Sequence, residues 1–357
     1  MTLVEILQDK DFQDLDYVFN TDLYAEKNNT EYTTIQGSIS TLPYEFYEGS
    51  AVVYNNEIHI LGSSKSSYRT AHYKFNGSSW TSVSTLPYNF YYGSAVVYNN
   101  EIHILGSSSS SKPTAHYKFN GSSWTSVSTL PYDFYAGSAV VYNNEIHIMG
   151  SGSSSSNETK HYKWDGSSWT EVSTLPYNSY DSSAVVYNNE IHIMGSGISS
   201  YYKAHYKFNG SSWTSVSTLL YNFYAGSTVV YNNEIHIMGG SGNKTTHYKW
   251  DGSSWTPVST LPYEFRYGSA VVYNNEIHIL GSFESSYRTY HYKYGLVLLT
   301  KMYLPTNTYI ICNPLTSVTS TPSNLTQFTY GYIVNNTGIV TISGNFTLCY
   351  IGVTKVL

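Results

Sequence analysis

The stretch Gly49-Ser50-Ala51-Val52-Val53-Tyr54-Asn55-Asn56-Glu57-Ile58-His59-Ile60-Leu61-Gly62 recurs along this 357-residue chain with little change. Its Glu-Ile-His-Ile element begins in turn at Glu57, Glu101, Glu145, Glu190, Glu234 and Glu276. Successive copies are therefore 42 to 45 residues apart. Because an internal period of this length is typical of propellers and solenoids, the repeat decides the fold before any other feature does.

Each copy predicts four short strands. Residues 49–54 form the first, and the dipeptide Asn55-Asn56 is a hairpin signal that leads into the second strand at 57–61. A serine-rich loop precedes the third strand at 71–75, and Trp80 opens the fourth after an Asn-Gly-Ser-Ser turn. The repeats sustain no 3.6-residue period, so helices are not expected there.

The copies resemble the Kelch-repeat family, whose pattern is a strand pair ending in Gly-Gly, then a Tyr, then a Trp before the next repeat. Gly239-Gly240 keeps the double glycine, whereas the other copies read Gly-Ser, as at Gly62-Ser63. Tyr73 and Trp80 match the Tyr and the Trp of the family, and the resemblance spans roughly residues 32–294. It implies that every repeat is one four-stranded blade of a β-propeller.

The copies also predict how the ring closes. Six units contain the first three strands, but only five contain the fourth, which begins at Trp80, Trp124, Trp169, Trp213 and Trp255. Residues 32–42 precede the first unit and align with a fourth strand, with Ile39 in the place of Val83 and Gln36 in the place of Trp80. We therefore predict an all-β fold: a six-bladed Kelch-type β-propeller closed by an N-terminal strand, with a small C-terminal β domain.

Composition divides the chain into an acidic N-terminal arm or anchor at residues 1–31, the propeller at 32–294 and a small β-rich domain at 295–357. The formal net charge is −6, and the first 31 residues carry all of it. That arm has two interpretations, an anchor to a partner and a loosely held terminus. Residues 295–357 contain neither Asp nor Glu, which suits a self-associating interface, although a packed sandwich has a similar composition.

Several classes of function are disfavoured. The balanced charge of the repeats argues against nucleic-acid binding, and no apolar run is long enough for a membrane-spanning helix. The first residues lack the basic region and the long apolar core of a signal peptide, so we expect synthesis in a host cytoplasm. Cys312 and Cys349 lie outside the repeats, and the sequence leaves open whether they pair.

All 12 histidines belong to the repeats, six in Glu-Ile-His and six in His-Tyr. Metal sites usually need ligands that converge from different positions, so packing between blades is favoured, and neither metal nor cofactor is expected. The Kelch resemblance also extends to enzymes, galactose oxidase and a sialic acid epimerase among them. A copper-radical site needs a Cys beside a Tyr within the propeller, and near-identical blades do not supply distinct catalytic roles. We therefore expect no enzymatic activity and no catalytic residue.

The copies differ mainly in two loops, one between the second and third strands and one between successive blades. Strand alternation places both at the same end of the propeller, the variable face, whereas the two invariant turns share the opposite end, the uniform face. Drift in tolerant loops explains variation but not its confinement to one face. The candidate ligand-binding residues on the variable face are Tyr47, Arg69, Tyr91, Tyr92, Tyr135, Tyr180, Tyr201, Tyr224, Arg266, Tyr267 and Arg288.

Aromatic rings among Ser and Asn side chains suit sugars, whose CH faces stack and whose hydroxyls need hydrogen bonds. The near-identical repeats and the Asn-, Tyr- and Ser-rich composition of the blades also resemble Kelch proteins in the tails of phages and prophages of low-GC bacteria. This resemblance implies a virion or phage-tail-like particle protein that binds a glycan or protein on the host surface. Residues 1–31 or 295–357 would contact other particle proteins, and a homo-oligomer is expected, a trimer by analogy with phage fibres. The alternatives are a structural or scaffold protein that binds a neighbouring protein, and a Kelch-propeller carbohydrate enzyme.

Overall fold

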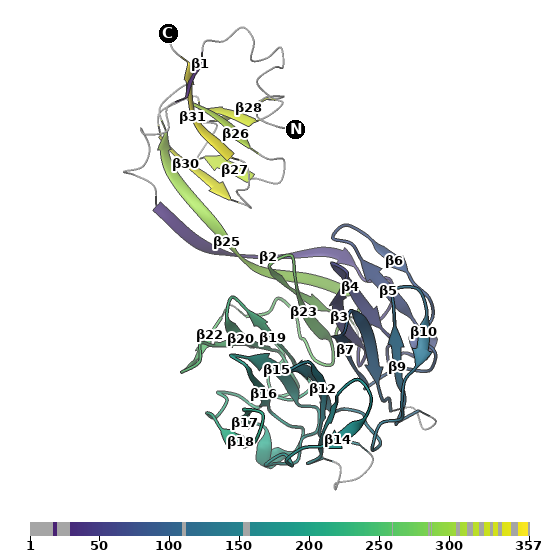
Figure 1. The fold of residues 1–357 in the computed structure, drawn as a ribbon. Helices are drawn as coiled ribbons and strands as arrows, with labels where there is room; N and C mark the ends of the chain where they lie inside the picture. The colour runs from purple at the N-terminus through teal and green to yellow at the C-terminus, as the bar shows by residue number, and fades with distance from the viewer. Residues whose placement is uncertain are drawn as a thin grey trace. The chain divides into compact units, whose positions relative to one another are not determined.

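In the computed structural model, six antiparallel sheets stand in a ring as the blades of a β-propeller (Figure 1). The structure describes residues 17–19, 29–108, 112–152, 158–258, 260–284, 286 and 288–304, and six strands between residues 308 and 355. Side chains are described within these ranges from residue 39 to residue 295. The predicted all-β propeller with six blades is confirmed. The helical elements of the described residues are two 3-10 turns, η2 (Ser66–Tyr68) and η3 (Ser199–Tyr201).

Each blade contains four strands, in chain order in blades 1 to 5, whereas blade 6 takes β2 as its fourth strand. Blades 1 and 2 consist of β3 (Ser50–Tyr54), β4 (Glu57–Leu61), β5 (His72–Phe75), β6 (Trp80–Ser82), and of β7 (Ser94–Tyr98), β8 (Glu101–Leu105), β9 (His116–Phe119), β10 (Trp124–Ser126). Blades 3 and 4 consist of β11 (Ser138–Tyr142), β12 (Glu145–Met149), β13 (His161–Trp164), β14 (Trp169–Glu171), and of β15 (Ser183–Tyr187), β16 (Glu190–Met194), β17 (His205–Phe208), β18 (Trp213–Ser215). Blades 5 and 6 consist of β19 (Ser227–Tyr231), β20 (Glu234–Met238), β21 (His247–Trp250), β22 (Trp255–Pro257), and of β23 (Ser269–Tyr273), β24 (Glu276–Leu280), β25 (Tyr290–Leu304), β2 (Asn29–Thr41).

The first hairpin of a blade follows from its two asparagines. Asn55 and Asn56 have φ angles of 49° and 58°, and the equivalent pairs of the other blades also have positive φ. Two successive left-handed residues make the tight turn that matches the twist of paired strands, and asparagine tolerates that conformation well. The turn fixes the register in which Tyr54 lies opposite Glu57.

The core lies between neighbouring blades. Ile58 and Ile60 of β4 are fully buried, and they belong to a cluster that includes Phe46 and, from the preceding blade, Val271 and Leu280. Around the axis each first strand lies beside the next, and β23 contacts β3. A blade therefore buries its apolar faces only by packing on its neighbours, as expected for a closed ring.

The ring closes as predicted, because β2 pairs with β25 as the fourth strand of blade 6. The Leu42 amide donates to the Thr289 carbonyl at 2.8 Å, and the Phe46 amide donates to the Arg288 carbonyl at 2.9 Å. The bonds between Leu86 and Thr70 and between Phe90 and Arg69 are their equivalents in blade 1. An N-terminal strand thus completes the last blade and removes an open sheet edge.

The chain divides into two compact units, Gln36–Tyr294 and a second formed by Met1–Ile35 with Gly295–Leu357. The described strands of the second unit include β1 (Tyr17–Phe19), β26 (Thr308–Cys312), β27 (Ser317–Ser320), β28 (Leu325–Phe328), β29 (Gly331–Val334), β30 (Gly338–Ser343) and β31 (Cys349–Lys355). In it, β31 lies between β1 and β26, with Cys349 opposite Cys312 in the register. Residues 1–16 and 20–28 of the predicted arm lie outside the described residues. No helix in the part of the chain that the structure describes is long and apolar enough to cross a membrane.

Candidate functional site

The uniform face repeats one ion pair in every blade. Its first member is Lys74 to Glu57, with 2.9 Å between Nζ and Oε2. The other five are Lys118 to Glu101, Lys163 to Glu145, Lys207 to Glu190, Lys249 to Glu234 and Lys293 to Glu276. Six equal and neutralised pairs give this face little that would distinguish one ligand orientation from another. The variable face is therefore the better candidate for a site.

A closed ring of backbone hydrogen bonds surrounds the axis at the variable face. It is formed by the residues that occupy one equivalent position in each blade: Glu48, Tyr92, Ala136, Asp181, Ala225 and Tyr267. The amide of each donates to the carbonyl of the one before it, at 2.6 to 2.8 Å, and Glu48 donates to Tyr267 to close the circle. All six have φ angles between 51° and 57°. Non-glycine residues in this region carry backbone strain, which the bonded ring holds in place.

The side chains of this ring form the axial cluster Glu48, Tyr92, Asp181 and Tyr267. The Tyr92 hydroxyl donates to Glu48 Oε1 at 2.6 Å, and the Tyr267 hydroxyl donates to Asp181 Oδ2 at 3.0 Å. The two phenol rings meet edge to face, 5.7 Å apart. With the two alanines and the Gly or Ser that follows each of the six, they line a cavity of about 120 Å³.

Burial sets the protonation of the axial cluster. It raises the pKa of Asp181 to about 7; the Tyr267 hydrogen bond opposes this rise, and the charge of Glu48 adds to it. Burial, followed by the hydrogen bond to Glu48, raises the pKa of Tyr92. Burial, followed by the charge of Asp181, raises the pKa of Tyr267. Both phenols therefore remain protonated donors at neutral pH, while Asp181 takes up a proton near neutrality.

We expect Asp181→Asn to stabilise the fold at pH 8. The folded carboxyl has a higher pKa than the unfolded one, so its ionisation opposes folding as the pH rises above the unfolded pKa of about 3.9. Removing that cost should raise the free energy of unfolding by about 2 to 4 kcal/mol at pH 8 and by less than about 1 kcal/mol at pH 4.5. Urea unfolding of variant and wild type at several pH values measures the difference.

Asp165→Asn is the matched control. Asp165 lies in an exposed turn where Asn76 stands in blade 1, and both side chains accept hydrogen bonds from the following serines. Those bonds, first among them the one from the Ser168 backbone, lower the pKa of Asp165 to about 2. This exchange should therefore produce no gain at pH 8. If the Asp181→Asn protein were no more stable than wild type at pH 8, the claim that ionisation of Asp181 opposes folding would be contradicted.

A ring of tyrosines lies outside the axial cluster. Five of its six equivalent positions are Tyr47, Tyr91, Tyr135, Tyr180 and Tyr224, and the sixth is Arg266. Tyr47 is buried and the other four tyrosines are half-buried. The preceding blade supplies a neighbour at several of these positions: Arg69 lies 4.5 Å above the Tyr91 ring, Arg288 lies 4.8 Å above the Tyr47 ring, and Tyr202 stacks on Tyr224 at 5.0 Å.

The structure thus places most of the predicted site residues in one concentric arrangement. Tyr92 and Tyr267 lie at the axis, and the tyrosine ring and the three arginines surround them. Tyr201 lies apart, because in η3 its ring packs against buried Tyr177 at 5.3 Å. Sequence reasoning missed Tyr202, Glu48 and Asp181. The signal for the two acids was in the chain, since the residue before the first strand's Gly-Ser or Ser-Ser is an acid in two blades and uncharged in the other four.

The serine that replaces the second glycine of most repeats connects the two variable loops. Ser63 Oγ donates to the Glu45 carbonyl at 2.8 Å, and the Ser64 amide donates to the Tyr47 carbonyl at 3.0 Å. Ser107, Ser196 and Ser282 make the equivalent side-chain bonds in blades 2, 4 and 6. These part-buried bonds join the two variable loops of a blade, so they hold the loops that carry the tyrosines in one arrangement.

The twelve histidines form six buried pairs, one in each blade. His59 Nδ1 lies 2.8 Å from His72 Nε2, and the other five pairs are 2.8 to 2.9 Å apart. The third-strand histidine also packs on the next blade, as where the His72 ring lies 5.1 Å from Phe119. Among the described residues, no group of three or more His, Cys, Asp or Glu side chains is placed to hold a metal ion. The pairs are therefore part of the packing between blades.

One of these pairs also contacts the neighbouring blade through a serine. Trp80 Nε1 donates to Ser40 Oγ at 3.2 Å, and the same oxygen lies 3.2 Å from His291 Nδ1. His278 Nδ1 lies 2.8 Å from His291 Nε2, so in this hydrogen bond one of the two ring nitrogens carries the proton and the other accepts it.

Comparison with known proteins supports the fold. A solved structure titled "Structure of YjhT" has a TM-score of 0.62 to this chain at 16% sequence identity, and the match covers 73% of this chain and 96% of that one. No protein-family model and no curated protein sequence matches the chain. At this identity the similarity shows a shared propeller fold, and the chemistry of the site has to be argued from the residues of this chain.

Proposed function

We propose that this chain is a non-enzymatic binding protein that recognises a glycan on a host surface through its variable face. The supporting observation is the arrangement of half-buried tyrosines around a small polar cavity, on the face where the blades differ most. Tyr91, Tyr135, Tyr180 and Tyr224 each offer a partly exposed ring. Aromatic rings with nearby hydroxyl and amide groups match the CH faces and hydroxyls of sugars.

The dimensions of the site indicate how a sugar would lie. A cavity of about 120 Å³ is smaller than the roughly 300 Å³ of a typical small-molecule pocket. A sugar ring would therefore lie across the tyrosine ring and direct one hydroxyl or small substituent into the axial cluster. There the carboxylates of Glu48 and Asp181 would accept its hydrogen bonds.

The particle assignment extends this proposal. The order of the repeats and the blade composition resemble Kelch proteins of phage tails, so we propose a virion or phage-tail-like particle as the location. Residues 1–31 or 295–357 would then bind other particle proteins, with the chain as a homo-oligomer. The mass of the full chain in solution tests the oligomer, and a monomer at micromolar concentration would contradict it.

We expect the double variant Tyr135→Ala/Tyr180→Ala to lose glycan binding. Each ring should contribute about 0.5 to 1.5 kcal/mol of stacking, so the pair should weaken binding by about tenfold or more. The measurement is a glycan array followed by equilibrium titration of every retained glycan. Lys118→Ala, which breaks one ion pair of the uniform face, is the control and should bind within about twofold of wild type.

The second candidate is a structural or scaffold protein whose variable face binds a neighbouring particle protein, since the same tyrosines also suit a peptide. Particles assembled without this chain distinguish the two. Particles that form but fail to adsorb to cells support receptor binding. Particles that fail to assemble support the scaffold role, and retention of no glycan at micromolar concentration would count against the first proposal.

A further inference from the structure

The arginines of this chain are confined to one part of the variable face. The sequence contains only Arg69, Arg266 and Arg288, and its fifteen other basic side chains are lysines. Arg266 and Arg288 lie in the two variable loops of blade 6, and Arg69 lies in the loop between the second and third strands of blade 1. Lysine makes the repeated ion pair in all six blades of the uniform face.

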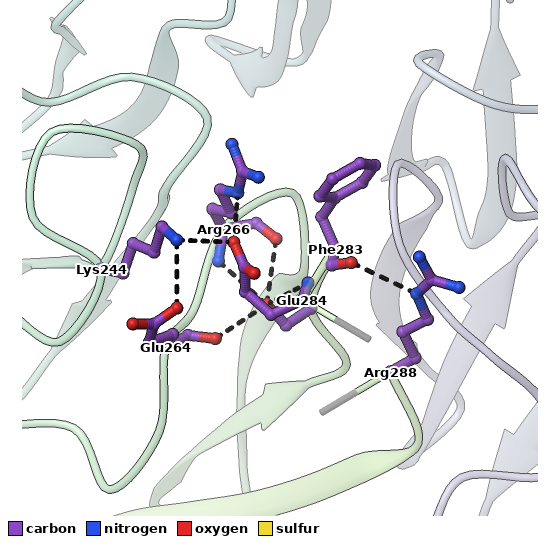
Figure 2. A network of polar contacts seen from close by, with 7 residues as sticks. Lys244, Glu264, Arg266, Phe283, Glu284 and Arg288 are labelled. Carbon is purple, nitrogen blue, oxygen red and sulfur yellow. Dashed lines mark hydrogen bonds and ion pairs between the residues drawn. The ribbon is translucent and has the colours of Figure 1, made fainter. Parts of the chain in front are cut away.

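Each guanidinium lies over at least one aromatic ring. Arg69 lies 4.5 Å above Tyr91, and Arg288 lies 4.8 Å above Tyr47. Arg266 lies 4.7 Å above the Phe283 ring, and Arg288 lies 5.9 Å from the centre of the same ring. Figure 2 shows Phe283 between the two arginines of blade 6. Such a cation–π contact holds a guanidinium at the ring while its N–H groups can still donate hydrogen bonds.

The Nε–H group of each of the three arginines donates a hydrogen bond within the protein. Arg69 Nε donates to the Ser64 carbonyl at 3.4 Å, Arg266 Nε to Glu284 Oε1 at 2.7 Å, and Arg288 Nε to the Phe283 carbonyl at 3.2 Å. Arg288 also donates through one terminal nitrogen to Glu45 Oε2 at 3.0 Å. Within the described residues, the terminal nitrogens of Arg69 and Arg266 make no hydrogen bond. The terminal N–H groups of these two arginines can therefore still donate to a ligand.

Lysines neutralise the carboxylates beside these arginines. Lys244 Nζ lies 2.8 Å from Glu284 and 3.0 Å from Glu264, and Lys65 Nζ lies 3.3 Å from Glu45 (Figure 2 draws the Lys244 contacts). The hydrogen bond from Lys244 is the first cause of the lowered pKa of Glu284, and that from Arg288 is the first cause of the lowered pKa of Glu45. The network of these five cations and three carboxylates therefore keeps a net charge of +2 at neutral pH.

We propose that Arg69, Arg266 and Arg288 form an anion-binding arc that takes the acidic group, a carboxylate or a phosphate, of a surface glycan. This inference rests on the proposed function and narrows its ligand to acidic glycans. A planar fork with two outer donors matches an oxyanion in a way that the point charge of a lysine does not. The arc borders Tyr47, Tyr91 and Tyr267, so an acidic substituent would lie at its forks while the sugar ring stacks on the tyrosines.

The test uses the full chain with three probes of equal length: a galacturonic acid trimer, a glycerol phosphate trimer and a neutral galactose trimer. Wild type should bind at least one acidic trimer tenfold or more tightly than the neutral one. Arg69→Gln/Arg266→Gln should abolish that preference. Arg69→Lys/Arg266→Lys should lose most of it, because the charge remains but the forks do not. The tighter acidic probe identifies the oxyanion, uronate or polyol phosphate.

Lys112→Gln/Lys203→Gln is the matched control, since it removes the same charge from two variable-face loops that contain none of the three arginines. It should keep the preference within about twofold, and unfolding midpoints of all variants check that the fold is intact. Equal binding of all three trimers would overturn the arc. The proposed function would still stand in that case if Tyr135→Ala/Tyr180→Ala weakened the binding of the trimers. The arc would also be overturned if Arg69→Lys/Arg266→Lys kept the full preference for acidic trimers, or if Lys112→Gln/Lys203→Gln lost as much of it as Arg69→Gln/Arg266→Gln. Either result would show that the preference depends on net charge alone.

Discussion

Acidification from pH 7 to pH 5 is expected to unfold the propeller in one steep transition. All twelve histidines are at most 3% exposed. Burial is the first cause that lowers their pKa values, to about 4 on the second strands, as for His59, and to about 3 on five of the third strands, as for His72. On the remaining third strand, burial holds the pKa of His247 well below its usual value. In the unfolded chain their pKa values return to about 6.5. The unfolded state therefore binds protons that the folded state excludes.

The sign and size follow from linkage. A group whose pKa is lowered by folding contributes stability above its unfolded pKa and loses it as the pH falls toward its folded pKa. Each histidine costs about 1.4 kcal/mol per pH unit below 6.5, so twelve together cost about 16 kcal/mol per unit as an upper value. A domain is typically stable by about 5 to 15 kcal/mol. The midpoint should therefore lie between about pH 5 and pH 6.

Circular dichroism against pH, with proton uptake measured by potentiometry, checks this result. His103→Asn/His116→Gln is the informative variant, because the amide groups can replace the hydrogen bond between the two rings without titrating. Its uptake should fall by about two protons, one-sixth of the wild-type value. A propeller that is still folded at pH 4.5 would show that the paired imidazoles take up protons without cost, contrary to the geometry.

Gly106→Ala should destabilise the propeller by at least about 3 kcal/mol, from steric overlap together with the strain of a positive φ. Gly106 ends β8 with a φ of +63°, and a Cβ atom there would lie 1.9 Å from the carbonyl oxygen of Phe134. Phe134 is fully buried in the loop that leads to Tyr135, and its amide is bonded to the Pro113 carbonyl. Relief of the overlap would therefore shift the loop that carries the site.

Gly121→Ala separates the two contributions, and urea unfolding at pH 8 compares them. Gly121 has a φ of +99°, which is less favourable to alanine, but the nearest atom to an added Cβ would be the Tyr54 hydroxyl at 3.3 Å. We expect it to cost about 1 to 2 kcal/mol. If Gly106→Ala proved no more costly than Gly121→Ala, the close packing of the loop against the strand end would be contradicted.

The repeat made the fold predictable, because one unit contains all the local signals and its six copies agree. The hairpin asparagines, the strand patterns and the substitution of residues 32–42 for the missing fourth strand were all legible in the sequence. The histidine pairs were not, because they depend on register. His59 lies opposite Lys74 while His72 lies opposite Leu61, and only that diagonal brings the two rings together on one face of the blade.

The site was predictable in location but not in its connections. Loop variation identified the face and most of its aromatic side chains. It could not reveal that Tyr92 and Tyr267 turn to the axis and bond to Glu48 and Asp181, or that Arg69 and Arg288 reach the tyrosines of the next blade. These contacts join residues from different blades, and their distances depend on how the ring closes. Tyr201 and Tyr202 are adjacent in sequence, and only the geometry of η3 decides which one faces Tyr224.

A crystal structure of the full chain with a glycan retained in the array tests the central claim most directly. The account predicts that the sugar lies across Tyr91, Tyr135, Tyr180 or Tyr224, with one substituent directed into the cavity between Glu48 and Asp181. A glycan bound to the uniform face, or one bound only outside residues 36–294, would contradict recognition through the variable face of the propeller.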